Sequence, residues 1–579
     1  MPSAVETRDA CPIVRTHQRF LLRSLEFTQQ YAPMYRCRLE AQYTPAIRAI
    51  QHIVTQHAAN GVSSAGLLDP RRVLELQPGV PAICVGVVYK NMKMLPRFLD
   101  EYQRELVRID AGDEDNDDDG GGAVESVPLD AKDAVSGMMN EEGELSNGGQ
   151  ALAAENEQYS VCNSADELML EDSSGRVLLQ GLNPERFCTG VVLGIYGNLL
   201  ANGSIAVIRY AFAGDLRSSY VPRSLAHITD SAIEPCYIAF VSGLSINLPR
   251  DGSREEHAAV AKARASLELL VDFLCGGTSN AALRTKAKHV TRLVIGGDSI
   301  APTDELKLKK KVKLDPSDHV RMNDDKAQAG IVTSAALMRE LDVVLERVVS
   351  SVEVEMMPGD NDMSDAFQPQ QPLHPVLLPK AARHSTLRLV SNPFCFTALP
   401  PACAWKSGAE EGSDKKKHRS EVSDGVNVFV TSGQNINDVA RESRFPTRLD
   451  TMSLVIESGC ACPTAPNTLF SYPFCKRDPF LFERTPHCMV ACDQPRFETR
   501  FATLEKMYAE THHSYAGAEA AKEAGKQKTE SANEETETEG AGAGVRLICV
   551  PSFARSGALV LMDVNSPTLE TTAVNFTVP

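Results

Sequence analysis

The sequence predicts an α/β protein that also contains an all-β part. Three observations support this fold class: the length of 579 residues, strand-like segments before residue 230, and alternating strand and helix patterns after residue 236. A single hydrophobic core stops growing at about 250–300 residues, so a chain of this length divides into at least two domains. We therefore expect a β domain followed by a layered α/β domain.

The β part is predicted from four apolar segments: 81–92, 176–181, 189–200 and 204–213. The last two flank a short Ala-Asn-Gly turn, which predicts a hairpin. Short strands with glycines at the bends suit a small barrel such as an OB-fold, although the periodicity also allows an open sandwich. A helical lead-in is expected between about Tyr31 and Asn60.

From residue 236 the pattern alternates between strands and helices. Strands are expected at 236–243, 290–298 and 352–360, and a helix closed by Gly276 separates the first two. An apolar stripe at helical spacing marks a second helix, with the residues Ile331, Leu337, Leu341, Val344, Leu345 and Val348. In such a fold the loops after the strands hold the site. These loops begin SGLS, GGDS and PGDND.

The net charge of −17 is concentrated in two segments. Residues 110–160 contain fifteen Asp or Glu and one Lys, and residues 519–539 contain seven Glu and three Lys. The rest of the chain is therefore near neutral, so net charge does not by itself predict basic partners. We expect disordered inserts at about 110–160, 407–425 and 516–544, where Gly, Ser and charge replace aromatics, and a flexible N-terminus over residues 1–30.

The fifteen cysteines are expected to be reduced and mostly to lie in the core. Their number is odd, and the close pairs Cys460/Cys462 and Cys488/Cys492 lack the paired C-x-x-C spacing of a structural zinc site. No segment approaches the roughly 18 apolar residues of a membrane helix, and the first residues lack the apolar core of a secretory signal. We expect a cytosolic or nuclear protein.

Five motifs indicate a family: LELQPG (74–79), taken as a strand start, QQPLHP (370–375), LVSNPF (389–394), TSGQNINDV (431–439) and CPTAPNTLFSYPFCKRDPFLF (462–482). Together they resemble the B-subunit family of replicative DNA polymerases, and within it the small, second subunits of polymerase delta. The resemblance implies an OB-fold over residues 31–230 and a calcineurin-like metallophosphoesterase α/β sandwich over residues 231–579.

Active phosphoesterases of this fold hold two cations about 3.5–4 Å apart with Asp, Asn and His ligands. The corresponding positions depart from that pattern. The first strand motif D-x-H becomes Gly243 and Ser245, and G-D-x-x-D keeps Asp298 but has Ala301 at its second acid. The loop P-G-N-H-D has Asp360 and Asn361 in place of its Asn and His and keeps Asp362.

The two remaining motifs also lack imidazoles. A later H-G becomes Ser432-Gly433, and the closing G-H-x-H falls on Cys492, Asp493, Gln494 and Pro495. We expect His374 and His487 to be packed or hydrogen-bonded rather than metal ligands. The sequence therefore predicts no catalytic, cofactor-binding or metal-binding residues, and Asp298 and Asp360 are expected to be caps or loop hydrogen-bond acceptors.

The resemblance implies a nuclear, non-catalytic scaffold of polymerase delta in DNA replication and repair synthesis. Its partners would be the cysteine-rich, metal-containing C-terminal domain of the catalytic subunit and a third, elongated subunit that reaches the sliding clamp. The B-subunits of the alpha and epsilon polymerases share this fold. We favour delta because of the stretches TSGQN and PTAPNTL. The basic runs 307–313 and 415–419 are expected to be solvated loops, although either could serve as a nuclear import signal.

Two other functions stay open from the residues alone. One is an active metal-dependent phosphoesterase or nuclease with rearranged ligands. The other is single-stranded DNA binding by the barrel, which requires stacking aromatics in a basic groove. The barrel segments contain the aromatics Tyr89, Tyr196, Tyr210 and Phe212 but few basic residues among them, so we expect little intrinsic DNA binding.

Overall fold

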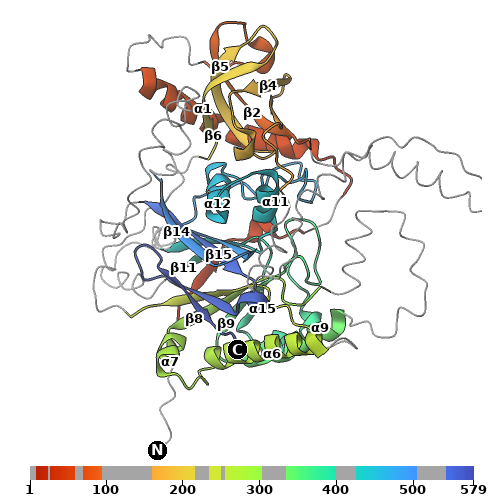
Figure 1. Ribbon diagram of the computed structural model, residues 1–579, viewed down its shortest axis with the longest axis vertical. Helices are drawn as coiled ribbons and strands as arrows, with labels where there is room; N and C mark the ends of the chain where they lie inside the picture. The colour runs from red at the N-terminus through yellow and green to blue at the C-terminus, as the bar shows by residue number, and fades with distance from the viewer. Residues whose placement is uncertain are drawn as a thin grey trace, which may run out of the picture.

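The computed structural model describes residues 8, 10–23, 27–58, 69–93, 160–214, 234–248, 254–302, 334–399, 425–504 and 543–578. They form one closed barrel and two six-stranded sheets. Figure 1 shows the layers in order: the barrel at the top, a pair of helices, two stacked sheets, and a final layer of helices at the bottom. Nearly all of the three predicted inserts, both basic runs and Ile331 lie outside the described residues.

The barrel closes in the order β2-β3-β4-β6-β5. Its strands are β2 (Pro81–Asn91), β3 (Glu167–Glu171), β4 (Arg176–Gln180), β5 (Val192–Leu199) and β6 (Ile205–Phe212). The predicted β5–β6 hairpin is confirmed by antiparallel pairing, and the open-sandwich alternative is wrong. The helical lead-in is also confirmed as α1 (Ala32–Ala58), which lies so close to β5 that a Cβ on Gly194 would be 2.8 Å from the Ala46 carbonyl oxygen.

The lower sheet has the order β10-β9-β8-β7-β16-β17. The predicted strands are confirmed as β7 (Tyr237–Val241), β8 (Val290–Gly296) and β9 (Glu353–Met357), which pair in parallel. The sheet is completed by β10 (Leu387–Leu389), β16 (Ala558–Asp563) and β17 (Thr571–Asn575). Its outer face is covered by α6 (Arg254–Leu274), α7 (Ala281–Lys288) and α9 (Ser334–Val349) (Figure 1).

The ends of α6 and α9 follow from their sequences. Gly276 has a φ of +76°, and the Gly277 N–H donates to the Asp272 carbonyl at 2.7 Å, which closes α6 as predicted. In α9 the described members of the apolar stripe pack toward the sheet; Leu337, Leu341 and Leu345 are each at most 1% exposed. The helical period of the stripe therefore matches one buried face.

The upper sheet has the order β1-β11-β12-β13-β15-β14. Its strands are β1 (Ile13–Arg15), β11 (Phe394–Ala398), β12 (Val426–Thr431), β13 (Cys488–Gln494), β14 (Glu498–Thr503) and β15 (Gly544–Pro551). A short helix, α15 (Phe553–Ser556), follows β15. Alternate residues face opposite cores: Val428 and Val430 pack between the two sheets, whereas Phe429 packs toward the barrel.

Two helices separate the upper sheet from the barrel: α11 (Gln434–Glu442) and α12 (Arg448–Glu457). Thr447 and Asp450 form a capping box at the start of α12. Met452 of α12 belongs to the hydrophobic cluster that also contains Leu193 of the barrel and Met489 of the sheet. One continuous core therefore joins the barrel to the layer beneath it.

The expected strand start at residues 74–79 is wrong. These residues form a 3₁₀ turn, η2 (Val73–Glu75), and a bend at Gly79 with φ +77°, so that β2 begins only at Pro81. The Val73 N–H donates to the Asp172 carboxylate at 2.8 Å, and the Arg72 N–H donates to Glu75 at 3.1 Å. Side-chain carboxylates, one local and one from the β3–β4 turn, therefore accept these backbone N–H groups in place of a neighbouring strand.

Residues 10–23 also differ from the expected flexible N-terminus. β1 pairs antiparallel with β11 at the edge of the upper sheet. Phe20 is fully buried, with its ring centroid 6.5 Å from those of Phe429 and Phe480. The expectation of reduced, mostly buried cysteines is confirmed, since the fourteen cysteines described are free and ten of them are buried.

Candidate functional site

Three loops of the lower sheet meet at one edge because β7, β8 and β9 run in parallel. Gly243 and Ser245 follow β7, Asp298 follows β8, and Asp360 to Asp362 follow β9. The Ser245 N–H donates to the Asp298 carbonyl at 3.1 Å, and the Asn361 N–H donates to the Asp298 side chain at 2.8 Å. The sequence-predicted positions of the lower sheet are therefore adjacent.

The upper sheet contributes Asp493, which lies at an irregularity of β13. Its N–H donates to the Ser242 hydroxyl at 3.1 Å, and its carboxylate accepts from Arg555 at 3.3 Å. Ser245, Asp298 and Asp493 all have positive φ, between 45° and 53°. Such backbone is strained in non-glycine residues and persists only where the surrounding structure fixes it.

Two buried carboxylates organise these loops. Asp362 accepts three backbone N–H groups, from Gly359 at 2.8 Å, Ser299 at 2.9 Å and Ile300 at 3.4 Å. Burial raises the pKa of Asp362. Burial, followed by repulsion from Asp362 and Asp493, raises the pKa of Asp298. Asp298 is confirmed as a loop hydrogen-bond acceptor, as the sequence predicted.

Ser432 lies in a second, uncharged group. The Asn392 Nδ2 lies within hydrogen-bond distance of three oxygens, those of Ser432 at 2.5 Å, Gln370 at 2.7 Å and Gln434 at 2.8 Å. The Ser432 N–H donates to the Asn392 side-chain oxygen at 3.1 Å. The comparison with active phosphoesterases does not point to these amides. They lie in the motifs QQPLHP, LVSNPF and TSGQN, so these motifs are the sequence feature that could have indicated the amide group.

The histidine expectation is confirmed by hydrogen bonds. The His374 Nδ1 accepts from the Val376 N–H at 3.2 Å and caps a 3₁₀ turn, η6 (Pro375–Leu377). The His487 Nδ1 accepts from the Asn427 N–H at 3.0 Å. In the part of the chain that the structure describes, no group of three or more His, Cys, Asp and Glu side chains is placed to hold a metal ion.

Two known families match the chain in succession. The profile of the "DNA polymerase delta subunit OB-fold domain" matches residues 30–210, which contain α1 and the barrel. The profile of the B-subunit of the alpha and epsilon DNA polymerases matches residues 238–399 and 421–499, which contain most of the two sheets. The chain is therefore similar to the B-subunits of DNA polymerases over both of these regions.

Three curated relatives align along most of the chain. "DNA polymerase delta small subunit" of Oryza sativa subsp. japonica is 28% identical over 506 residues, 87% of this chain and 85% of the relative. The protein of the same name from Arabidopsis thaliana is 26% identical over 93% of this chain and 89% of its own length. That of Saccharomyces cerevisiae is 25% identical over 95% of this chain and 90% of its own length.

Arg38 connects the two regions that the profiles match. It is fully buried on α1 and donates to the Asp478 carboxylate at 2.7 Å. Its other donors reach the Gly190 carbonyl of the barrel at 3.1 Å and the Pro463 and Ala465 carbonyls at 2.6 and 2.9 Å. The motif CPTAPNTL therefore folds around an arginine from the other matched region.

Lys90 makes a second buried junction. From β2 its ammonium donates to the Glu442 carbonyl at the end of α11 at 2.5 Å, and it lies 3.6 Å from the Asp166 carboxylate. Burial raises the pKa of Glu442 to about 7. Because buried charges of this kind require specific partners, these contacts fix the barrel on the α11–α12 layer.

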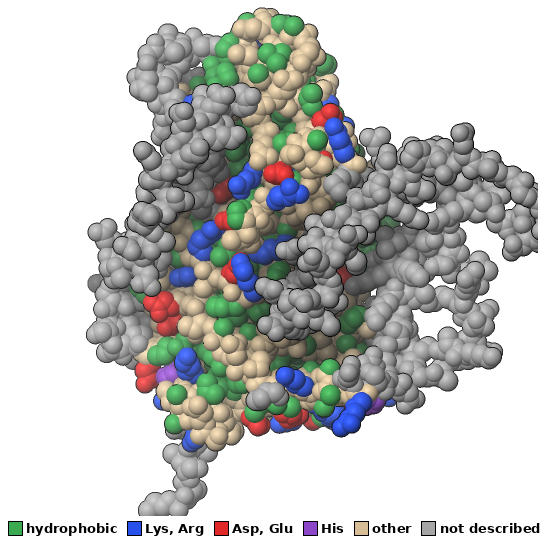
Figure 2. Space-filling view, in the orientation of Figure 1, with side chains coloured by type: hydrophobic (Ala, Val, Ile, Leu, Met, Phe, Trp, Pro, Cys, Tyr) green, Lys and Arg blue, Asp and Glu red, His purple; other side chains and the backbone are tan. Residues whose placement is uncertain are grey.

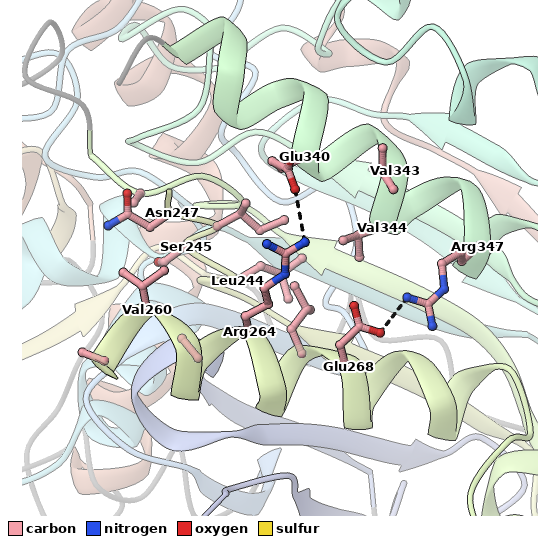
Figure 3. A pocket seen from close by; sticks show the side chains of 15 residues that line it. Leu244, Ser245, Asn247, Val260, Arg264, Glu268, Glu340, Val343, Val344 and Arg347 are labelled. Carbon is pink, nitrogen blue, oxygen red and sulfur yellow. Dashed lines mark hydrogen bonds and ion pairs between the residues drawn. The ribbon is translucent and has the colours of Figure 1, made fainter. Parts of the chain in front are cut away.

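A pocket of about 300 Å³ lies beside the strand ends, between α6 and α9. Ser245 and Ala301, two of the positions compared with active phosphoesterases, line it. Figure 3 shows that ion pairs cross it from helix to helix: Arg264 with Glu340 at 3.6 Å and Arg347 with Glu268 at 2.6 Å. Asp298 and Asp362 are not among its lining residues, so the buried carboxylates do not face this pocket.

Proposed function

We propose that this chain is a non-catalytic accessory subunit of DNA polymerase delta. The names of the rice, Arabidopsis and yeast relatives support the choice of delta, and the alignments extend over both matched regions. In this proposal the chain divides at about residue 230 into an OB-fold region and a calcineurin-like phosphoesterase sandwich that has lost its activity.

The proposal rests mainly on the side chains at the strand ends, which cannot form a two-metal centre. Gly243 and Ala301 offer no metal-binding side chain, and Asp298 and Asp362 accept backbone N–H groups of the same loops. A two-metal centre requires carboxylates and imidazoles that converge on the ions, so the residues present do not fit one. The strand ends therefore serve to fix loops, and the function lies on the protein surface.

The proposed partners are the cysteine-rich C-terminal domain of the catalytic subunit and a further subunit, with the complex located in the nucleus. Permanent assemblies of this kind need large interfaces rather than a pocket. No helix within the described ranges is long and apolar enough to cross a membrane.

Co-expression tests the proposal directly. We expect soluble yield of the chain to rise several-fold with the catalytic subunit, because a partner that binds only the folded form stabilises it. Purification from nuclear extract should recover both polymerase subunits. A chain that is soluble and monodisperse alone, and that recovers neither subunit, would contradict an obligate scaffold role. Metal-stimulated phosphodiester hydrolysis abolished by Asp298→Asn would instead establish the active-enzyme alternative.

A further inference from the structure

Arginine side chains gather on one face of the molecule. Figure 2 shows Lys and Arg side chains in a band across the middle of this view, at the level of α11, α12 and β14 in Figure 1. Six residues of these elements, of the loops beside them and of the barrel turn Pro184–Arg186 form what we call the arginine face: Arg186, Arg441, Arg444, Arg448, Arg496 and Arg500.

Four of these arginines pair with carboxylates that are less exposed than they are. The side-chain exposures are 60% and 20% for Arg444 and Glu185, 73% and 15% for Arg496 and Glu498, 35% and 9% for Arg441 and Asp438, and 38% and 25% for Arg500 and Asp450. The acids therefore orient the guanidinium groups from beneath, and solvent meets mainly positive charge.

The other two arginines lack such a carboxylate among the residues described. Arg186 lies over the Phe445 ring at 5.0 Å. Arg448 stands at the positive N-terminal end of α12, where a cation is unfavourable. The face therefore has donors and charge left for an anionic ligand.

The acidic part of the chain is attached at this face. Residues 110–158 contain fifteen Asp or Glu and one Lys. Directly after them, the Ser160 hydroxyl and the Val161 N–H donate to the Arg441 carbonyl at 3.1 and 3.0 Å. The Arg444 guanidinium donates to the Cys162 carbonyl at 3.2 Å. The chain therefore leaves the described structure at two of the six arginines.

We propose that the arginine face binds the chain's own acidic segment, residues 110–158, and that other polyanions compete with it. Glu155 and Glu157 lie within five residues of Ser160, a reach of at most about 18 Å. A tethered ligand acts at an effective concentration of the order of millimolar. A nucleic-acid backbone has the same anionic chemistry but must be recruited from solution, so the tethered segment has the advantage.

A photo-crosslinking amino acid placed at Leu152 of the full chain tests where the segment binds. We expect cross-links to concentrate on residues 182–190, 438–450 and 494–503 and to fall at least fivefold in R186Q/R444Q/R496Q and in 0.5 M salt. The matched control R36Q/R264Q/R347Q removes three exposed, ion-paired arginines elsewhere and should change the yield less than twofold. Cross-links spread evenly over the surface, or unchanged in the first variant, would overturn the proposal.

Competition with a 30-nucleotide oligothymidylate gives a second measurement that does not alter the arginine face. We expect a full chain with all fifteen acids of 110–158 replaced by Asn or Gln to bind the oligonucleotide at least tenfold more tightly than the natural chain at low salt. Adding R186Q/R444Q/R496Q should remove that gain. Equal affinity of the natural and neutralised chains would show that the segment does not occupy the face and would overturn the proposal.

Discussion

The Arg38 guanidinium and the Asp478 carboxylate form an ion pair at 2.7 Å in which both side chains are completely buried. The two residues come from the two regions that different family profiles match. Since Arg38 also donates to four carbonyls, one side chain satisfies acceptors of the barrel and of the loop after α12. The two regions are therefore joined by a specific polar contact as well as by a shared apolar core.

We expect Arg38→Ala to lower the free energy of unfolding by roughly 3–5 kcal/mol, because it leaves the buried Asp478 charge and several carbonyls without a donor. Chemical denaturation of the co-expressed, purified chain measures the loss. Arg36 on the same helix is the matched control, since its pair with Glu40 is long, at 4.0 Å, and exposed. Arg36→Ala should cost less than about 1 kcal/mol. Similar losses in the two variants would contradict a structural role for Arg38.

Gly190 lies where the barrel approaches the same loop. Its φ is +90°, and an added Cβ would be 2.0 Å from the Pro463 carbonyl oxygen. We expect Gly190→Ala to cost roughly 3 kcal/mol or more from combined strain and overlap. Gly203 has a φ of +80° but no atom within 4 Å of the added Cβ, so Gly203→Ala should cost only about 1–2 kcal/mol. Gly190→Ala should therefore unfold at a lower temperature than Gly203→Ala. Because both substitutions strain the backbone, the difference between the two thermal midpoints measures the effect of the steric overlap with Pro463.

Glu355 links the two sheets at their edge. It is fully buried on β9 and accepts from Arg15 of β1 and Arg292 of β8, both at 2.6 Å. We expect Glu355→Gln to cost roughly 3–5 kcal/mol because two arginines lose their shared counter-charge. Glu353 also pairs with Arg292 but is 53% exposed, so Glu353→Gln should cost about 1 kcal/mol or less. The hydrogen-exchange rates of the β1 backbone amides should rise in Glu355→Gln and stay unchanged in Glu353→Gln.

Sequence patterns predict those helices and strands whose own residues show a clear apolar periodicity. The buried strands β7 to β9 and the α9 stripe follow from apolar periodicity, and the convergence of Gly243, Asp298 and Asp362 follows from parallel strand order. Contacts between distant segments have no local signature. Arg38 looks like an ordinary charge on a surface helix, although its carboxylate partner stands 440 residues later. Phe20 likewise becomes core only because β1 adds to a distant strand.

Asp298 makes stability depend on pH. Its pKa is raised to about 8 from an ordinary value of 3.8, so the folded state holds a proton that the unfolded state has already released between these two values. Stability therefore falls as pH rises through that interval and is highest below it, because the folded state binds more protons than the unfolded state. Asn at this position can still accept from the Asn361 N–H, and it tolerates the positive φ.

We therefore expect Asp298→Asn to stabilise the chain more at pH 8 than at pH 5, by a difference on the order of 1–3 kcal/mol. Thermal unfolding of both proteins across pH 5–8 measures it. Asp360→Asn, in the neighbouring loop after β9 but at an exposed position, should shift stability by less than about 0.5 kcal/mol at either pH. If Asp298→Asn instead destabilises the chain most at pH 8, the carboxylate is needed in its charged form. The inference that folding raises the pKa of Asp298 would then be wrong.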